Sequence, residues 1–326
     1  MTHQTRPVPA VPAGQSPDMS QRALAPEQPE FTRQWQEIAD LHGKQLFFVG
    51  GFQKSGTTWL QVMLNAHPDI ACGGEGHFLD TLAPQLLSAV EQYNAVIARK
   101  NATVLRELPP YPCFGDAEFR YLMVAAVAMM LARSCEGRHV KVVGEKTPDN
   151  LAHFPVLEEL FPQAKFIHIV RDGRDCLVSN WFHNLRVNRG DAMRLYGTVG
   201  AFVDEFAAAW ASQVTAGLRF GATRPDRCLT VHYEDLCQAP TETMGRVFRF
   251  LGVDADDVVV RTCVEDGAFE VMSGGRRPGD EDRTSLMRRG LPGNWRDHLD
   301  DDVVRRFLVE AGEVMRQLGY LAEEPA

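Results

Sequence analysis

The sequence lacks the features that define several broad classes of protein. Its longest apolar run, Tyr121–Ala132, has 12 residues, whereas a transmembrane helix needs about 20, so we predict a buried helix there and no membrane span. Basic side chains are outnumbered, 34 against 43 acidic, which gives a formal net charge of -9. This excludes a general nucleic-acid coat, because binding the phosphate backbone requires a basic surface.

Paired cysteines and a secretory leader are also missing. The seven cysteines are odd in number and include no C-x-x-C pair, so neither a disulfide framework nor a zinc ribbon is predicted. Residues 1–30 contain six prolines and no apolar core of a signal peptide. We therefore expect a disordered, proline-rich tail over 1–30, a reducing compartment and a cytoplasmic location.

What the sequence does contain is a series of short apolar segments separated by helical patterns. Apolar residues make up 44% of the chain, enough for a large core. Alternation of strands and helices predicts an α/β fold with a mostly parallel central sheet and helices on both faces. We expect one domain over 31–322, with a helical insertion at about 80–138. The predicted strands are 45–50, 70–72, 140–143, 166–170 and 229–231.

Polar residues follow most of these strands at the point where each strand ends. Ligands of parallel α/β sheets bind at the carboxyl ends of the strands, so one edge of the sheet is predicted to form the site. The segments concerned are Gln53–Ser55, Glu145–Thr147, Arg171–Asp172 and Tyr233–Glu234.

The glycine-rich segment Gly50–Thr58 lies between a strand and a helix, as a phosphate-binding loop does. It departs from the ATPase pattern, in which lysine directly follows the second glycine. Here Thr57 follows Gly56, and the lysine stands earlier, at Lys54. A ligand with one 5′ phosphate needs less neutralisation than a triphosphate with Mg²⁺. No metal site is predicted.

The stretch Lys54–Trp59, KSGTTW, resembles the 5′-phosphosulfate loop of sulfotransferases that use 3′-phosphoadenosine 5′-phosphosulfate (PAPS). The resemblance implies that Lys54 contacts the transferring group, that the loop amides and threonines bind the 5′ phosphate, and that Trp59 stacks on adenine. It also implies a P-loop-type three-layer sandwich. The nucleotide-binding residues expected from this segment are Gln53, Lys54, Ser55, Gly56, Thr57, Thr58 and Trp59.

Two later segments resemble the parts of the same family that bind the 3′ phosphate. Arg171 at a strand end and Ser179 eight residues later match the first, and a guanidinium fork suits a phosphate dianion. The second is LMRRGLPGNW, in which Arg288, Arg289 and Gly290 are the implied ligands. We predict a mobile lid loop at about 272–293.

The adenine contacts are less well matched. Tyr233 matches an adenine-contacting tyrosine, with a core tyrosine as the alternative. Phe269 matches an adenine-flanking phenylalanine, but Gly267 stands where relatives have threonine.

The segment Asn65–Phe78 resembles the tyrosylprotein sulfotransferases, whose glutamate base matches Glu75. His77 and Glu145 are alternative bases, and Lys146 matches a second lysine that steadies the sulfate. We interpret His168 as a core histidine and His183 as a helix-packing one.

The sequence thus predicts a PAPS-dependent sulfotransferase that acts on a small-molecule, lipid or sugar acceptor and releases 3′-phosphoadenosine 5′-phosphate (PAP). The insertion at about 80–138 is expected to shape the acceptor pocket. A P-loop kinase and a catalytically inactive nucleotide-binding protein are the alternatives, and the oligomeric state is open.

Overall fold

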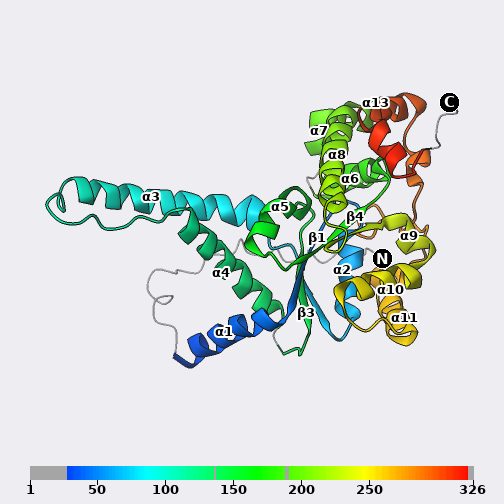
Figure 1. Ribbon diagram of the computed structural model, residues 1–326. Coiled ribbons are helices and arrows are strands. Elements are labelled where there is room, and N and C mark those ends of the chain that lie inside the picture. The colour runs from blue at the N-terminus through cyan, green and yellow to red at the C-terminus, as the bar shows by residue number, and fades with distance from the viewer. Residues whose placement is uncertain (1–27, 136, 188–190, 322–326) are drawn as a thin grey trace, which may run out of the picture.

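Five parallel strands form the centre of the structure, a computed structural model (Figure 1). It describes residues 28–321 except 136 and 188–190, so the predicted tail lies outside it up to residue 27. The strand order is β2-β3-β1-β4-β5, and every neighbouring pair is parallel. The predicted α/β fold is therefore confirmed. The strands are β1 (Gln45–Gly50), β2 (Ile70–Gly73), β3 (Val142–Lys146), β4 (Lys165–Val170) and β5 (Cys228–His232).

Strand β3 differs from its prediction, 140–143, because it continues through two charged residues. Glu145 pairs with Phe48 and Lys146 with Val49 of β1, and both charged side chains are buried. Charged letters are typical of a loop, but here hydrogen bonds from neighbouring elements satisfy them inside the sheet. Both residues therefore lie in the sheet rather than after it.

Helices surround the sheet on both faces (Figure 1). The first, α1, begins at Gln28, three residues before residue 31, where the domain was predicted to start. The helices are α1 (Gln28–Asp40), η1 (Leu41–Gly43), α2 (Thr57–Ala66), η2 (Phe78–Leu82), α3 (Ala83–Ala102), α4 (Asp116–Ser134), α5 (Asn150–Leu160), α6 (Gly173–Val187), α7 (Asp191–Tyr196), α8 (Val199–Ala222), α9 (Tyr233–Gln238), α10 (Pro240–Leu251), α11 (Asp257–Asp266), α12 (Phe269–Met272), η3 (Asn294–Asp297) and α13 (Asp301–Gln317).

Alternating residues of β1 divide the core between the two faces of the sheet. Phe48 packs in one cluster with residues of α4 and α5, while Phe47 packs in another with residues of α2, α10 and α11. A third cluster, centred on Trp210 and Phe307, joins α6, α8 and α13. These clusters fix the helices that begin at the carboxyl edge of the sheet, α2 and α6 among them.

The insertion consists of η2, α3 and α4, and its outer part projects away from the sheet (Figure 1). The apolar run in α4 is only half buried: Met123 and Val127 are in the core, but Tyr121 and Met130 are 69% and 52% exposed. The prediction of a buried helix holds for one face only, because α4 contacts the body with that face. Among the described helices, none has the length and apolarity that a membrane crossing requires.

Candidate active site

The loop between β1 and α2 contains the residues predicted to bind the 5′ phosphate. It ends at Gly56, which has φ 97° and precedes the first turn of α2. A side chain at Gly56 would come within 2.6 Å of the Tyr233 ring, so both the backbone conformation and the space require glycine. The first amides of a helix have no intrahelical acceptors and face its positive dipole end. The start of α2 is therefore suited to hold an anion.

Lys54 lies in this loop with φ 69°, a left-handed conformation that is unfavourable for a residue with a side chain. Arg171 stabilises it by donating from Nη1 to the Lys54 carbonyl oxygen at 3.2 Å. Burial lowers the pKa of Lys54 to about 8, and the positive charges of Arg186 and Arg171 act in the same direction. An anionic ligand would relieve this accumulation of positive charge.

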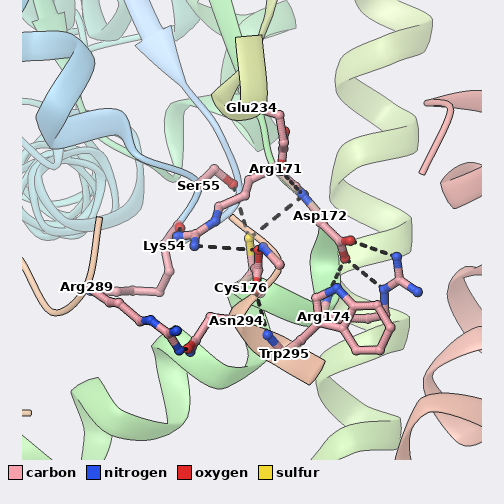
Figure 2. Close-up of polar contacts among 12 residues, drawn as sticks. Lys54, Ser55, Arg171, Asp172, Arg174, Cys176, Glu234, Arg289, Asn294 and Trp295 are labelled. Atoms are coloured by element: carbon pink, nitrogen blue, oxygen red, sulfur yellow. Dashed lines mark hydrogen bonds and ion pairs between the residues drawn. The ribbon is translucent and has the colours of Figure 1, made fainter. Parts of the chain in front are cut away.

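Arg171 follows β4 and is itself held from several sides (Figure 2). Its guanidinium carbon lies 4.2 Å from the centre of the Tyr233 ring, and Nη2 lies 3.8 Å from the Asp175 carboxylate. Its buried Nε has no hydrogen-bond partner among the described residues. Ser179, two turns along α6, lines the same cavity as Arg171. The pair predicted to hold the 3′ phosphate is therefore brought together.

Asp175 connects this part of the site to the C-terminal segment. Its carboxylate accepts hydrogen bonds from the backbone amides of Gly293 at 2.6 Å and Trp295 at 2.9 Å. The Trp295 ring also stacks under Arg174, 3.9 Å away, which Asp172 holds through two hydrogen bonds (Figure 2). No local pattern marks Asp175 as a connecting residue. Its main contacts join segments about 120 residues apart.

Arg288, Arg289 and Gly290, the predicted ligands of the 3′ phosphate, all line the cavity. Arg288 forms an ion pair with Glu281, and Arg289 lies 2.6 Å from Asp297. Gly290 has φ 71° and packs so closely on the ring of Phe269 that a side chain would clash. The terminal guanidinium nitrogens of Arg288 and Arg289 are thus paired, whereas the buried Nε atoms of both residues have no hydrogen-bond partner in the described structure.

Aromatic side chains form another wall of the cavity. Trp59 donates from its indole nitrogen to the Gly267 carbonyl oxygen at 2.7 Å and meets the Tyr233 ring edge to face at 5.5 Å. Trp59, Tyr233 and Phe269 all line the cavity. The absence of threonine at Gly267 is explained by this arrangement, because a side chain there would meet Met63 at 2.4 Å.

Glu75 and Lys146 meet at the carboxyl edge of β2 and β3. The Lys146 Nζ lies 2.6 Å from one Glu75 carboxylate oxygen and 3.4 Å from Thr58 Oγ1. Burial would raise the pKa of Glu75, but the hydrogen bond and charge of Lys146, together with His77, outweigh it and lower that pKa. Glu75 is therefore a carboxylate at neutral pH, and its side chain is 44% exposed to the cavity and solvent.

His77 lies beside Glu75 and is the second candidate base. Its Nε2 is 3.6 Å from the other Glu75 oxygen, while Nδ1 is 2.7 Å from Asp80. The hydrogen bond to Asp80 raises the pKa of His77 despite partial burial. His77 also has φ 47°, so it and Lys54 are the two residues other than glycine with positive φ in the described chain.

Glu145, the third candidate base, lies behind this loop instead of in the cavity. Its buried carboxylate accepts hydrogen bonds from the Gly76 amide at 2.8 Å, from Asn150 at 2.7 Å and from the Thr147 hydroxyl. Burial raises its pKa. Glu145 therefore positions the backbone between the other two candidates and is not itself placed to reach an acceptor.

These groups surround one cavity of about 550 Å³. In the part of the chain that the structure describes, the cavity lining contains two groups of cationic side chains and the Glu75 carboxylate. Lys54 belongs to the first group, and Arg171, Arg288 and Arg289 form the second. It is lined by Gln53, Lys54, Gly56, Thr57, Thr58, Trp59, Glu75, His77, Pro148, Asp149, Arg171, Ser179, His183, Tyr233, Phe269, Met272, Leu286, Met287, Arg288, Arg289, Gly290 and Leu291.

Comparison with known proteins bears directly on this arrangement. The sequence profile described as the sulfotransferase family matches residues 47–257, about two thirds of the chain. The chain belongs to the sulfotransferase family. It is 25% identical over 282 residues to a putative protein-tyrosine sulfotransferase of Caenorhabditis briggsae, covering 85% of this chain and 89% of that one. Protein-tyrosine sulfotransferase 2 of Gallus gallus is also 25% identical, over 84% of this chain and 69% of its own length.

Solved sulfotransferases share the fold at lower identity. The mouse sulfotransferase SULT7A1, solved with PAP, has a TM-score of 0.54 and 18% identity and covers 87% of this chain and 90% of its own. Sulfotransferase STF9 of Mycobacterium avium has a TM-score of 0.51 and 14% identity, with 89% and 80% covered. Both likenesses concern the fold of this sulfotransferase.

Most predicted site residues of the sulfotransferase line its cavity, but Ser55 and Lys146 do not. The Ser55 side chain is buried with Oγ 3.7 Å from Cys176 Sγ, and its amide donates to the Phe52 carbonyl oxygen at 3.1 Å. Ser55 thus closes the turn that shapes the loop. Lys146 is buried behind Glu75 and is connected to the cavity lining by its ion pair with the Glu75 carboxylate and its contact with Thr58.

His183 is the residue that sequence reasoning placed wrongly. It lines the cavity and contacts Arg186 at 3.0 Å, whereas a helix-packing role was expected. Its spacing of four from Ser179 on α6 is the signal that would have placed both on one helix face. His168 is fully buried, as expected, and burial lowers its pKa to about 3.

The insertion was expected to shape the acceptor pocket, yet no residue from 83 to 134 lines the cavity in the described structure. Pro148, Asp149 and the apolar residues near Met287 do so instead. The predicted lid loop is folded on itself, since Arg276 donates to the carbonyl oxygen of Arg288 at 3.1 Å. Its mobility stays a prediction.

One group of side chains bears on the expectation of no metal site, which stays a prediction. Ligand atoms of His77, Asp80 and Asp149 lie within 4.8 Å of one another. No local pattern indicates this set, because Asp149 is far along the chain from the other two. Both aspartates are exposed, and the hydrogen bond between His77 and Asp80 accounts for their closeness without an ion.

Proposed function

We propose that this sulfotransferase moves a sulfuryl group from PAPS to a hydroxyl group of its acceptor. The observation that carries the proposal is one cavity with two separate cationic clusters and a carboxylate. Lys54 and the start of α2 provide the first cluster, and Arg171 with Arg288 and Arg289 provides the second. Two clusters match a nucleotide with phosphate groups on both its 5′ and 3′ sides, and a single-phosphate nucleotide would leave the second cluster unused.

The first cluster supplies charge stabilisation. In our proposal the Lys54 ammonium binds the oxygen that bridges phosphate and sulfate, on which negative charge grows as the bond to sulfur breaks. The amides of Thr57 and Thr58 at the start of α2 hold the 5′ phosphate. The lowered pKa of Lys54 means that a bound anion restores its charge fully, which couples donor binding to the charged state.

Glu75 takes the proton in this proposal. The acceptor oxygen forms a bond to sulfur as sulfur separates from the phosphate oxygen, and the acceptor proton passes to the Glu75 carboxylate and then to water. Lys146 keeps that carboxylate ionised and oriented through the 2.6 Å contact. His77, 3.6 Å from Glu75, is the alternative base.

For the acceptor we propose only a chemical class. The relatives named above are protein-tyrosine sulfotransferases, and a phenolic hydroxyl, on a small molecule or on a peptide tyrosine, fits the same chemistry. We favour a small hydroxylated molecule, lipid or sugar in a cytoplasmic setting. The seven free cysteines of the structure support a reducing compartment. Turnover of PAPS against a panel of phenols, sugars, lipids and tyrosine peptides would decide the class.

Nucleotide selectivity tests the donor. We expect calorimetry to show PAP binding at least ~10-fold more tightly than AMP, because charge-assisted contacts to the second phosphate contribute about 1.5–3 kcal/mol each. Arg288→Ala should remove most of that difference and leave AMP affinity unchanged. Equal affinities for both nucleotides in the wild type would overturn the donor assignment, and tighter binding of ATP with Mg²⁺ would favour a kinase.

Two more results would separate the alternatives. Turnover is expected to persist in excess chelator, because cationic side chains supply the charge that Mg²⁺ supplies in kinases. Loss of activity that Mg²⁺ restores would contradict this and implicate His77, Asp80 and Asp149. PAP binding without turnover of PAPS on the whole acceptor panel would leave a binding protein as the function.

A further inference from the structure

The outer part of the insertion, residues 87–121, here called the arm, exposes an unusual number of apolar side chains. Figure 1 shows it projecting from the body along α3. No residue between Glu91 and Tyr121 is buried. Of the 20 large apolar residues that are exposed in the described chain, eight are in the arm. They are Leu87, Tyr93, Val96, Val104, Leu108, Tyr111, Phe114 and Tyr121.

Side-chain contacts fix the shape of the arm. Asn94 donates to and accepts from the backbone of Phe114, at 2.8 and 2.9 Å, and Asn101 does the same with Tyr111, at 2.9 and 3.0 Å. Two asparagines two helical turns apart thus bind the returning segment to α3. The rings of Tyr93 and Phe114 also meet at 5.5 Å. The apolar surface is therefore preformed and not the product of an unpacked loop.

Charges of opposite sign are separated along the arm. Near the tip, Arg99, Lys100 and Arg106 outnumber Glu107. At the base of the arm, nearer the body, the acidic residues are Glu91, Asp116 and Glu118; the pairing of Asn94 with Phe114 places Asp116 near the level of Glu91. None of Glu91, Asp116, Arg99 and Lys100 forms an ion pair with another described residue, and all four are exposed.

We propose that the arm is a dimer interface that pairs antiparallel with the arm of a second copy of this chain. In that arrangement the basic tip of each arm lies against the acidic base of the other, so the complementary contact forms twice, as two-fold symmetry requires. A membrane surface would match basic residues alone and leave the acidic base facing like charge. The charge pattern therefore selects a second copy.

The apolar area is sufficient for such an interface. Half-exposed side chains of this size contribute on the order of 100 Å² each, so the eight together offer on the order of 800 Å², about the area that a stable complex buries per partner. No arm residue lines the cavity, so the interface is independent of the proposed function.

Charge exchange in the full-length protein tests the proposal. Sedimentation velocity at 1–50 μM, concentrations set by typical dimer affinities, should show a dimer for the wild type. Arg99→Glu/Lys100→Glu and Glu91→Lys/Asp116→Lys should each weaken it by at least ~10-fold, because like charges then face each other. An equimolar mixture of the two variants should restore a dimer. The control, Arg249→Glu/Arg261→Glu on exposed positions of α10 and α11, should dimerise like the wild type.

Folding of each variant is checked by circular dichroism and by turnover, which should stay unchanged because the arm is outside the site. A wild type that is monomeric at 50 μM would overturn the proposal. So would dimers that survive both charge exchanges, or a mixture that stays monomeric. Binding of monomers to phosphatidylserine vesicles would assign the arm to a membrane, and stable capture by an unrelated protein in place of dimerisation would also refute it.

Discussion

The phosphate loop after β1 and the Gly74–His77 loop after β2 make an instructive pair. Both leave the same edge of the sheet, and each contains one of the two residues other than glycine with positive φ, Lys54 and His77. They are stabilised differently. The phosphate loop is closed by its own Ser55 turn and by Arg171. In the other loop, buried Glu145 and Thr147 accept hydrogen bonds from the backbone amides of Gly76 and His77. The side chains of Glu75 and His77 in this loop are partly exposed to solvent.

This difference separates the loop proposed to bind the nucleotide from the loop proposed to take the proton. Unfavourable backbone conformations persist only where surrounding contacts enforce them. In the phosphate loop those contacts come from Arg171, the proposed ligand of the 3′ phosphate, so the proposal links the two anion sites through this residue. In the Gly74–His77 loop they come from Glu145 in β3 and from Thr147 directly after it. Changes around Glu145 should therefore affect turnover with little effect on nucleotide affinity.

The strongest separation is expected from Glu75→Gln. The amide keeps the size of the side chain but accepts no proton, so kcat should fall by about 10²- to 10⁴-fold while PAP affinity barely changes. Assays of PAPS turnover measure kcat, and calorimetry with PAP measures the affinity. If His77→Asn gives the large fall and Glu75→Gln a small one, His77 is the base; if neither matters, the base assignment is wrong.

Lys54→Ala should come next in size, with kcat lower by roughly 100-fold, the effect of removing a preorganised charge-stabilising donor. Lys54→Arg is the matched control, since it keeps the charge and should recover part of the rate. A near-normal kcat for Lys54→Ala would make this lysine a structural residue of the loop.

Glu145→Gln probes the support beneath the second loop. Its side chain would lose one acceptor oxygen among the donors of Gly76, Thr147 and Asn150, and kcat should fall about 10-fold, as for residues that orient a reacting group. PAP affinity should stay within 2-fold of wild type, a bound set by loops that act independently. Glu158→Gln, which removes a carboxylate paired with arginines elsewhere, should leave kcat unchanged. Equal losses of kcat and PAP affinity would contradict the separation.

The smallest effect concerns pH. The pKa of Lys54 is lowered to about 8, so the ammonium is present below that pH and is lost as pH rises through it. PAP affinity should therefore decline above pH 8, by up to roughly tenfold between pH 7 and 9. Titration calorimetry across this range measures the decline, and Lys54→Met should abolish it. A pH-independent affinity in the wild type would show that Lys54 does not contact the nucleotide.

Much of the donor site is predictable from local sequence. A strand, a glycine-rich turn and a helix require each other's geometry, so the segment KSGTTW is enough to identify the phosphate loop. The same holds for Arg171 and Ser179, which a single strand-helix unit places two turns apart. Local spacing also contains the signal for His183, but a histidine on an apolar helix is more often in the core, and that general tendency favours packing over a place in the cavity.

Local sequence is enough to predict the parallel α/β fold and the polar residues at its strand ends, because apolar periodicity and loop geometry depend on neighbouring residues. The tertiary structure distinguishes Glu145, a support, from Glu75, a candidate base, since the two differ in burial and not in type. It also decided that Asp175 anchors Gly293 and Trp295 and that the insertion projects as an arm. Such contacts join residues far apart in the chain, and no local pattern encodes them.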